Sequence, residues 1–266
     1  LDSVVVSAER FINRKADSYI QIEVIDKTKI SSSNGDRLSD VLRISNSLNI
    51  KSYGSPVSLQ TVSMNGLSST HTLVLIDGVK LNSFQNSGFD LSAVPKDNIR
   101  KIEVINNGSS SIYGSEAVGG VINIITDNAL NNIEKPFSGK IITSLNTFSS
   151  KTFSLSLSGS YKKLKAGFYA SSMSSDGRYN YYFTTKNGSE LKERENSGYN
   201  GTDFSANLFY PFSNEQTLSF YTHYMRQYKE VPGIETGGAA PRTNQNDKNI
   251  NSILTYKRNF NSNISS

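Results

Sequence analysis

Apolar and polar residues alternate with a period of two through most of the second half of the chain. Phe153, Leu155 and Leu157 are each followed by a serine. The same alternation returns in four later segments: residues 164–170, 204–210, 218–224 and 254–256. Successive side chains of a strand lie on opposite faces, so the pattern predicts strands with one apolar and one polar face. With a further strand expected at residues 139–147, we predict six strands here.

The connections between these predicted strands alternate in length. Residues 161–164 and 211–215 are short, whereas residues 174–201 and 227–248 are long and polar. This alternation is typical of an outer-membrane β-barrel, whose strands of about 9–11 residues cross the bilayer with apolar side chains toward lipid. Aromatic residues near the strand ends would then form the interfacial girdle: Tyr161, Tyr210, Phe212 and Tyr224.

Two considerations bear on this interpretation. A soluble antiparallel sandwich also has alternating strands, but loops of about 20 residues or more are uncommon in compact domains. Six strands also cannot close a barrel, because bacterial barrels have at least about eight and an open edge is not tolerated in lipid. We therefore expect the second half to be part of a longer or split barrel.

The first half has mixed patterns instead. Alternation at Ile20, Ile22 and Val24 predicts a strand, and the apolar spacing in residues 38–42 predicts a short helix capped by Asn34 or Asp36. Three further apolar segments predict buried strands, at residues 73–76, 102–105 and 121–125. The first half is therefore predicted to be a small α+β domain.

Composition agrees with a division near residue 130. Of the 27 Phe and Tyr residues, 21 follow residue 127, and the formal net charge changes from −1 before that point to +6 after it. A solvated surface explains this excess, since no helix-turn-helix or clustered basic patch indicates nucleic-acid binding. No apolar run is long enough for a membrane helix. The chain has no initiator Met or signal peptide, so we expect a processed or trimmed product.

The residue types of the chain give little support for a catalytic function. The chain has no Cys and two distant His, so we find no nucleophile–base pair or metal cluster and expect no enzyme. The glycine-rich residues 114–120 lack the Gly-Lys-Ser/Thr of a phosphate loop. A tight bend before a buried strand explains the Gly119-Gly120 pair more simply.

Several stretches of the first half resemble the plug domain of TonB-dependent outer-membrane transporters. They are Thr72-Leu73-Val74-Leu75-Ile76-Asp77-Gly78-Val79, Ile102-Glu103-Val104-Ile105 and Tyr113-Gly114-Ser115-Glu116-Ala117-Val118-Gly119-Gly120-Val121-Ile122-Asn123-Ile124-Ile125-Thr126. The resemblance implies an α+β plug followed by an incomplete antiparallel transmembrane β-barrel, with about six strands of an expected 22, in the outer membrane of a Gram-negative bacterium. We expect an N-terminal segment at residues 1–12, the plug at 13–130 and barrel strands at 137–266.

The resemblance also implies an energy-transducing partner, the TonB protein. The stretch resembling its binding segment, the TonB box, consists of Asp2, Ser3, Val4, Val5, Val6, Ser7 and Ala8. A short β-branched terminal segment suits pairing as an added strand with a partner's sheet edge. The alternative is an ordinary N-terminal strand.

Substrate contacts in this family fall on two plug loops. They map here to Tyr53, Ser55, Pro56, Ser58, Leu59 and Gln60 in the first loop, and to Ser83, Phe84, Gln85 and Asn86 in the second. The chain most resembles the cobalamin-transporting members, which implies active uptake of cobalamin or a related corrinoid. Ferric siderophore or haem uptake remains an alternative, as does a non-transporting receptor or structural subunit. A surface lipoprotein is a further possible partner.

The chain departs from the family at two places. Arg is usual where Asn65 stands, and Arg-Gly-Pro where residues 106–108 stand. Because those arginines typically pair with acidic residues of the barrel wall, either neutral hydrogen bonds hold this plug or the barrel lacks the acids. No cofactor is expected. The cobalamin transporter binds calcium in barrel loops. The corresponding oxygen ligands here would be Glu190, Glu193, Glu195 and Asp203, but their spacing matches no calcium loop.

Overall fold

The computed structural model describes residues 5–6, 13–14, 22–53, 58–82, 88–106, 110–127, 135–186, 188–213, 215–233, 242–261 and 264–265. The chain divides into two compact units: residues 1–53 with 59–127, and residues 54–58 with 128–266. Within the described residues, no helix is long and apolar enough to cross a membrane.

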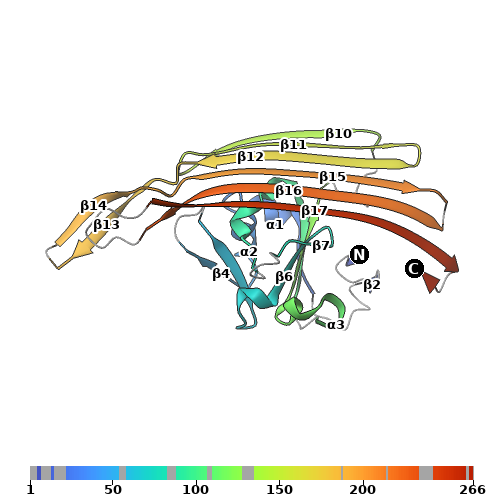
Figure 1. Ribbon diagram of the computed structural model, residues 1–266, viewed down its shortest axis with the longest axis horizontal. Helices are drawn as coiled ribbons and strands as arrows, with labels where there is room; N and C mark the ends of the chain where they lie inside the picture. The colour runs from blue at the N-terminus through green and yellow to red at the C-terminus, as the bar shows by residue number, and fades with distance from the viewer. Residues whose placement is uncertain are drawn as a thin grey trace. The chain divides into compact units, whose positions relative to one another are not determined.

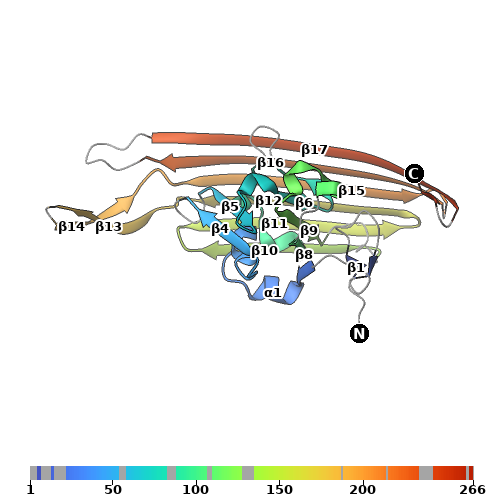
Figure 2. The ribbon, with the colours of Figure 1, turned by 90° about the horizontal axis from the view of Figure 1, so that it is seen from below.

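The first unit is built on a five-stranded sheet in the order β3-β8-β9-β6-β7. The strands are β3 (Ile22–Ile25), β6 (Thr72–Ile76), β7 (Val79–Lys80), β8 (Ile99–Ile105) and β9 (Gly120–Thr126). Strands β6 and β9 are parallel, and the other neighbours are antiparallel. The strands predicted around Ile22, Leu73, Ile102 and Val121 are confirmed (Figures 1 and 2).

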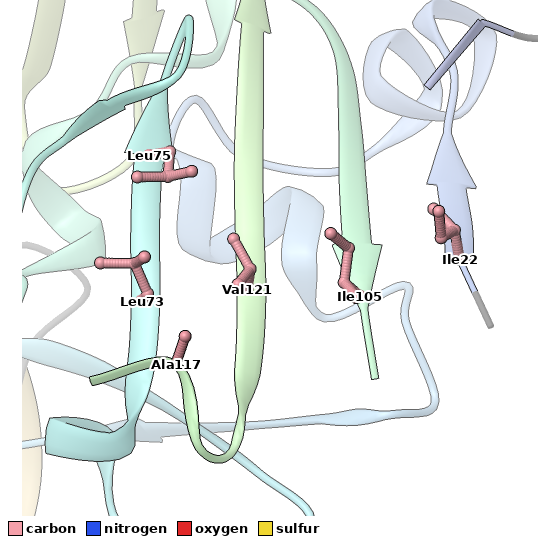
Figure 3. Close-up of a cluster of buried hydrophobic side chains, with 6 residues drawn as sticks. All are labelled: Ile22, Leu73, Leu75, Ile105, Ala117 and Val121. Carbon is pink, nitrogen blue, oxygen red and sulfur yellow. The ribbon is translucent and has the colours of Figure 1, made fainter. Parts of the chain in front are cut away.

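One face of this sheet carries a hydrophobic cluster that joins four of its strands. Its buried members are Ile22, Leu73, Leu75, Ile105, Ala117 and Val121. Figure 3 shows these side chains projecting from neighbouring strands, with Ala117 contributed by the segment before β9. Val24 and Tyr113 pack at the edge of the cluster. The cluster explains why these apolar segments form strands, since each buried aliphatic side chain contributes roughly 1.5–3 kcal/mol.

Short helices and two small hairpins complete the first unit. They are α1 (Lys27–Ser32), α2 (Leu38–Leu42), α3 (Ser110–Tyr113), the 3₁₀ segments η2 (Ser69–His71), η3 (Leu91–Ala93), η4 (Lys96–Asn98) and η5 (Ser115–Ala117), and the pairs β1 (Val5–Val6) with β2 (Asn13–Arg14) and β4 (Leu48–Ser52) with β5 (Gln60–Met64). Helix α2 is confirmed, but its predicted cap is wrong. Arg37 is the extended residue before the helix, and its N–H donates to Asp40 Oδ2 at 3.2 Å, so neither Asn34 nor Asp36 is needed as the cap.

The second unit is an antiparallel sheet in the order β10-β11-β12-β15-β16-β17-β18. Its strands are β10 (Ser138–Asn146), β11 (Ser150–Tyr161), β12 (Leu164–Ser175), β15 (Tyr199–Pro211), β16 (Gln216–Pro232), β17 (Arg242–Asn261) and β18 (Ile264–Ser265). Figures 1 and 2 show the six long strands side by side in one curved sheet. The six predicted strands are therefore confirmed.

Strand lengths and one predicted loop differ from expectation. Strands β16 and β17 have 17 and 20 residues rather than about ten, because they remain paired from Gln216–Arg258 to Pro232–Arg242 and shorten the loop predicted at 227–248. The loop predicted at 174–201 contains a hairpin of β13 (Tyr179–Thr185) and β14 (Gly188–Arg194), which extends beyond the end of the long strands (Figure 1).

The two faces of the long sheet differ in chemistry as the alternation predicts. Its apolar face is solvent-exposed, with exposed side chains on outer and inner strands: Ile141, Leu145, Phe153, Leu208, Ile250 and Leu254. Its polar face is largely buried, including Ser154, Ser171, Ser205 and Asn207. An apolar face turned outward is the arrangement that a lipid-facing wall requires.

Candidate functional site

The first predicted ligand loop lies at the end of the β4–β5 hairpin. Ser52 pairs with Gln60, and the Tyr53 N–H donates to the Leu59 carbonyl at 3.1 Å, which continues the pairing by one step. Tyr53 and Leu59 are 51% and 40% exposed, and Ser58 is half-buried. The exposed aromatic and aliphatic side chains at this apex are accessible to a ligand, as loop tips on a rigid scaffold often are.

Gln60 lies at the start of β5 and is only 2% exposed. Its N–H donates to Asp90 Oδ1 at 3.1 Å. This position makes Gln60 a support of the loop's end in the present conformation, whereas Tyr53 and Leu59 offer exposed surface. Ser55 and Pro56 lie outside the described residues.

The second predicted loop, with Ser83, Phe84, Gln85 and Asn86, also lies outside the described residues, but both of its flanks are well defined. Before it, buried Asn82 accepts a hydrogen bond from the Val74 N–H at 2.7 Å and donates to the Thr72 carbonyl at 3.1 Å. After it, Asp90 Oδ1 accepts from the Ser92 N–H at 2.9 Å, as well as from Gln60.

The Asp90–Gln60 hydrogen bond therefore joins the residues that follow the two loops. It crosses 30 positions of sequence and brings the end of the second loop next to the end of the first. Asn82 and Asp90 were missed from the sequence as site residues. Asp90 could have been found from its place before Leu91-Ser92, where an Asp commonly caps a helical turn.

The glycine-rich stretch and the strand that follows it, residues 114–126, hold the segment of the chain that precedes the second loop. Asp77, at a left-handed φ of 49°, accepts from the Thr126 N–H at 2.9 Å and from Thr126 Oγ1 at 2.7 Å. Lys80 forms an ion pair with Glu116 at 2.6 Å. The Gly119 N–H donates to the His71 carbonyl at 2.8 Å, so this amide already has a protein acceptor.

Glycine is required at the Gly119-Gly120 pair by close packing. A Cβ on Gly119 would lie 2.8 Å from the His71 carbonyl oxygen. A Cβ on Gly120, at φ 144°, would lie 2.1 Å from Met64 Sδ and 2.4 Å from the Ile105 carbonyl oxygen. The pair is therefore a close-approach bend, as the sequence indicates, and no phosphate-loop geometry is seen in the described residues.

Asn65 occupies the place of the family's arginine. Its side-chain amide donates to the Asn106 carbonyl and, at 3.0 Å, to the Gly119 carbonyl. These two neutral hydrogen bonds tie the β5 turn to the ends of β8 and of the glycine-rich stretch within the plug. Residues 107–109 lie outside the described part.

Comparison with known proteins points to one family for the first unit. The family described as TonB-dependent Receptor Plug Domain matches residues 14–121. The sheet that follows has the fold of part of a solved receptor. The predicted architecture, an α+β plug followed by an incomplete antiparallel transmembrane β-barrel in the outer membrane of a Gram-negative bacterium, is thus confirmed.

Similar proteins are found for the plug by sequence and for nearly the whole chain by fold. A vitamin B12 transporter of Vibrio vulnificus is 38% identical over 125 residues, which cover 47% of this chain and 20% of that protein. A solved ferric enterobactin receptor from Pseudomonas aeruginosa is 19% identical, with a TM-score of 0.68 over 97% of this chain and 40% of its own. A solved complex of the P. aeruginosa protein FpvA with a heterologous pyoverdine is 13% identical, with a TM-score of 0.70 over 96% of this chain and 34% of its own.

The chain thus spans less than half of these relatives, of which the first is a transporter and the second a receptor. This agrees with the prediction that it is not an enzyme.

The segment predicted as the TonB box is described only at Val5 and Val6. They form strand β1 and pair antiparallel with Arg14 and Asn13 of β2. The backbone at these two positions already has the extended conformation that an added strand needs.

A buried His–Asp pair in the barrel wall was missed from the sequence. His223 Nε2 and Asp203 Oδ2 lie 2.8 Å apart on neighbouring strands β16 and β15, and the Tyr221 ring stacks on the imidazole with centroids 6.5 Å apart. Asp203 is thus an acid of the barrel wall whose partner lies in the wall itself. A metal cluster would need a third such side chain beside the pair, and no group of three occurs in the described residues.

The oxygen ligands considered for calcium lie apart in the described structure. Glu190 pairs with Lys192 at 2.9 Å, Glu195 with Arg242 at 3.2 Å and Asp203 with His223. Within the part of the chain that is described, no three such carboxylates meet.

Proposed function

We propose that the protein takes up a scarce nutrient complex across the outer membrane in a TonB-dependent manner, and that its ligand is cobalamin or a related corrinoid. The observation that carries the proposal is the Asp90–Gln60 hydrogen bond, which brings together the ends of the two plug loops. The sequence identity of 38% over the plug to a vitamin B12 transporter supports the choice of ligand. The proposal includes no resident cofactor.

In this proposal, ligand binds at the two plug loops. The contacts are Tyr53, Ser55, Pro56, Ser58 and Leu59 from the first loop, whose end is supported by buried Gln60, and Ser83, Phe84, Gln85 and Asn86 from the second. The flanking bonds of Asn82 and Asp90 keep the loop ends in place, so that less conformational entropy is lost when the ligand binds. Exposed Tyr53 would supply a flat apolar surface and a polar tip.

The TonB protein is the proposed energy-transducing partner. It would pair with the segment Asp2–Ala8 by strand addition, because main-chain hydrogen bonds along an added strand resist a pull. The extended backbone of Val5 and Val6 supports this part of the proposal.

Ferric siderophore uptake is the second candidate function. The fold similarity to the ferric enterobactin receptor, over 97% of this chain, favours it. A receptor that signals without transport, or a subunit of a larger outer-membrane assembly with a lipoprotein, is the remaining possibility.

Calorimetric titration of the full-length protein with cyanocobalamin and with a ferric siderophore tests the ligand. We expect cyanocobalamin to bind and the siderophore not to bind. Ser58→Trp is expected to weaken binding by about tenfold or more, which corresponds to about 1.4 kcal/mol. Ser31→Trp is the matched control, because Ser31 is an exposed plug serine on helix α1, outside both loops. Siderophore binding alone would select the second candidate, and full affinity in Ser58→Trp would remove the first loop from the site.

A further inference from the structure

The short-turn end of the long sheet carries aromatic side chains in one row on its apolar face. Tyr161 pairs with Leu164 across the first turn, while Leu218 pairs with both Tyr210 and Tyr256 on its two neighbouring strands. These tyrosines are all exposed. Phe212 extends the row, with its ring 5.1 Å from that of Tyr210 in an edge-on arrangement. Aromatic rows of this kind mark the depth of the headgroups in a barrel wall.

Basic side chains lie immediately beyond this aromatic row. Lys162 and Lys163 form the turn between β11 and β12, and the Lys162 ammonium lies 5.5 Å from the centre of the Tyr161 ring. Lys163 Nζ lies 3.4 Å from the Phe212 carbonyl oxygen. Lys135 and Arg258 are exposed at the same end of the sheet, beside Ser160 and Gln216.

The charge at this end is strongly one-sided. In the described part of the chain, Glu215 is its one acidic residue, and neither Lys162 nor Lys163 forms an ion pair there. The opposite end is mixed, because Glu190 and Glu195 pair with cations. We call the set Tyr161, Tyr210, Phe212, Tyr256, Lys135, Lys162, Lys163 and Arg258 the short-turn belt.

We propose that the short-turn belt binds the phosphate groups of anionic glycerophospholipids. Short turns lie on the periplasmic side of an outer-membrane barrel, so the belt faces the phospholipid leaflet. The rings lie at the boundary of the apolar face, and the lysines reach past them to the level of the phosphates. Cations at this depth attract anionic headgroups. The proposal depends on the barrel fold and is independent of the transported ligand.

Competitive lipid binding to the full-length protein tests the proposal. Delipidated protein in detergent is mixed with equal amounts of phosphatidylglycerol and phosphatidylethanolamine, and native mass spectrometry counts each bound lipid. We expect the natural protein to prefer phosphatidylglycerol. In the Lys162→Gln/Lys163→Gln variant, the ratio of bound phosphatidylglycerol to bound phosphatidylethanolamine should fall about fivefold for each lysine replaced. Gln and Lys tolerate the left-handed φ of 53° at residue 162 about equally, so the turn should persist.

Lys186→Gln/Lys192→Gln, at the β13–β14 hairpin, removes the same charge from the opposite end and is expected to leave the preference unchanged. The preference should also weaken as salt is raised, since these side chains are exposed. Inorganic phosphate at matched ionic strength should not displace the lipid. The proposal is overturned if the natural protein shows no preference, if both double variants lose it equally, or if free phosphate competes.

Discussion

At the scale of single residues, polar side chains in the plug act by holding backbone groups. Asp77 accepts two hydrogen bonds from Thr126 at the end of β9. Asn123, on the same strand, accepts one from the Gly78 N–H at 3.3 Å and donates to buried Glu103 at 3.1 Å. The Asp-Gly turn after β6 is thereby fixed to β9 from two sides, which gives the family's Asp77-Gly78 signature a structural role.

Replacing Asp77 should therefore loosen the end of β9. We expect Asp77→Ala to lower the opening free energy there by about 2–4 kcal/mol, because both hydrogen bonds to a charged acceptor are lost. Hydrogen exchange of the Thr126 amide in the full-length protein measures it. Asp77→Asn is the control, since Asn keeps an acceptor oxygen and tolerates the left-handed backbone. Equal losses in both variants would contradict this role.

Asp26 gives helix α1 a pH dependence. Its carboxylate accepts from Thr28 Oγ1 and from the Lys29 N–H, and these bonds, the Thr28 one first, lower the pKa of Asp26 below 3.8. A lowered folded-state pKa contributes stability above the unfolded value, and that stability is lost as the pH falls through the folded value.

The cap of α1 is therefore expected to weaken in acid. Amide protection in residues 29–32 should exceed that of an Asp26→Asn variant at about pH 6, and the difference should shrink as the pH falls below the usual aspartate pKa of about 3.9. The measurement is hydrogen exchange corrected for the intrinsic rate at each pH. A difference that stays constant with pH would show that Asp26 acts without its charge.

Local residue roles were readable from the sequence only where the partner is near in the chain. A short helix at residues 38–42 follows from its apolar spacing, yet the identity of its cap depended on the extended backbone at Arg37. The hydrogen bond from the Gln60 N–H to Asp90 depends on the tertiary fold, and no pattern in the sequence predicts it.

At the scale of elements, the glycine pair at the start of β9 sets how closely β5, β8 and β9 can approach. Gly120 and Gly114 both have positive φ, of 144° and 92°, but only at Gly120 would a Cβ meet other atoms. Comparing them separates backbone strain from crowding.

Gly120→Ala is expected to destabilise the plug by about 3 kcal/mol or more, because overpacking adds to strain. Gly114→Ala should cost only the strain, about 1–2 kcal/mol. Chemical unfolding of the full-length protein, followed by protease resistance of the plug, compares the two. Similar costs would show that Met64 and Ile105 move aside freely.

The long sheet makes a depth-dependent prediction for its apolar face. On β15, Ala206 lies four residues from Tyr210 in the aromatic row, whereas Thr202 lies eight residues from it, on the same face beside Arg226. Eight residues of a tilted strand rise by about 20 Å, which is close to the roughly 25 Å apolar band of a barrel.

Ala206→Arg should therefore cost about 2–4 kcal/mol and Thr202→Arg about 0–1 kcal/mol. Folding into lipid vesicles, followed by denaturant titration, measures both. Equal losses of folding free energy in the two variants would show that the apolar face does not contact lipid.

Alternation was sufficient to predict which face of each barrel strand is apolar, but it was not sufficient to predict strand length. Outside the bilayer, both faces of a strand are polar, so the polar, Asn-rich residues 242–249 of β17 resemble a loop in sequence. The β13–β14 hairpin was missed for the same reason: charged residues 190–195 conceal it.

At the scale of the whole molecule, the sequence supports two units of different construction. The plug has a buried aliphatic cluster, and the barrel portion has an exposed apolar face. Family signatures, not composition, supplied the identity of the first unit, because many small α+β domains share its pattern. The ligand-loop tips and most of residues 1–21 lie outside the described residues, so the proposed contacts there stay predictions.

The central claim is that ligand uptake depends on an added strand at the N-terminal segment, while ligand binding does not. The test is paired measurement of cyanocobalamin uptake by cells and of its binding by purified full-length protein, for the natural chain and for a variant lacking residues 2–8. Val6→Pro, which removes a strand N–H, and Val6→Thr, which preserves strand propensity, refine the comparison. We expect the deletion and Val6→Pro to abolish uptake with binding intact, and Val6→Thr to behave as the natural protein. Unchanged uptake in the deletion variant would contradict the account.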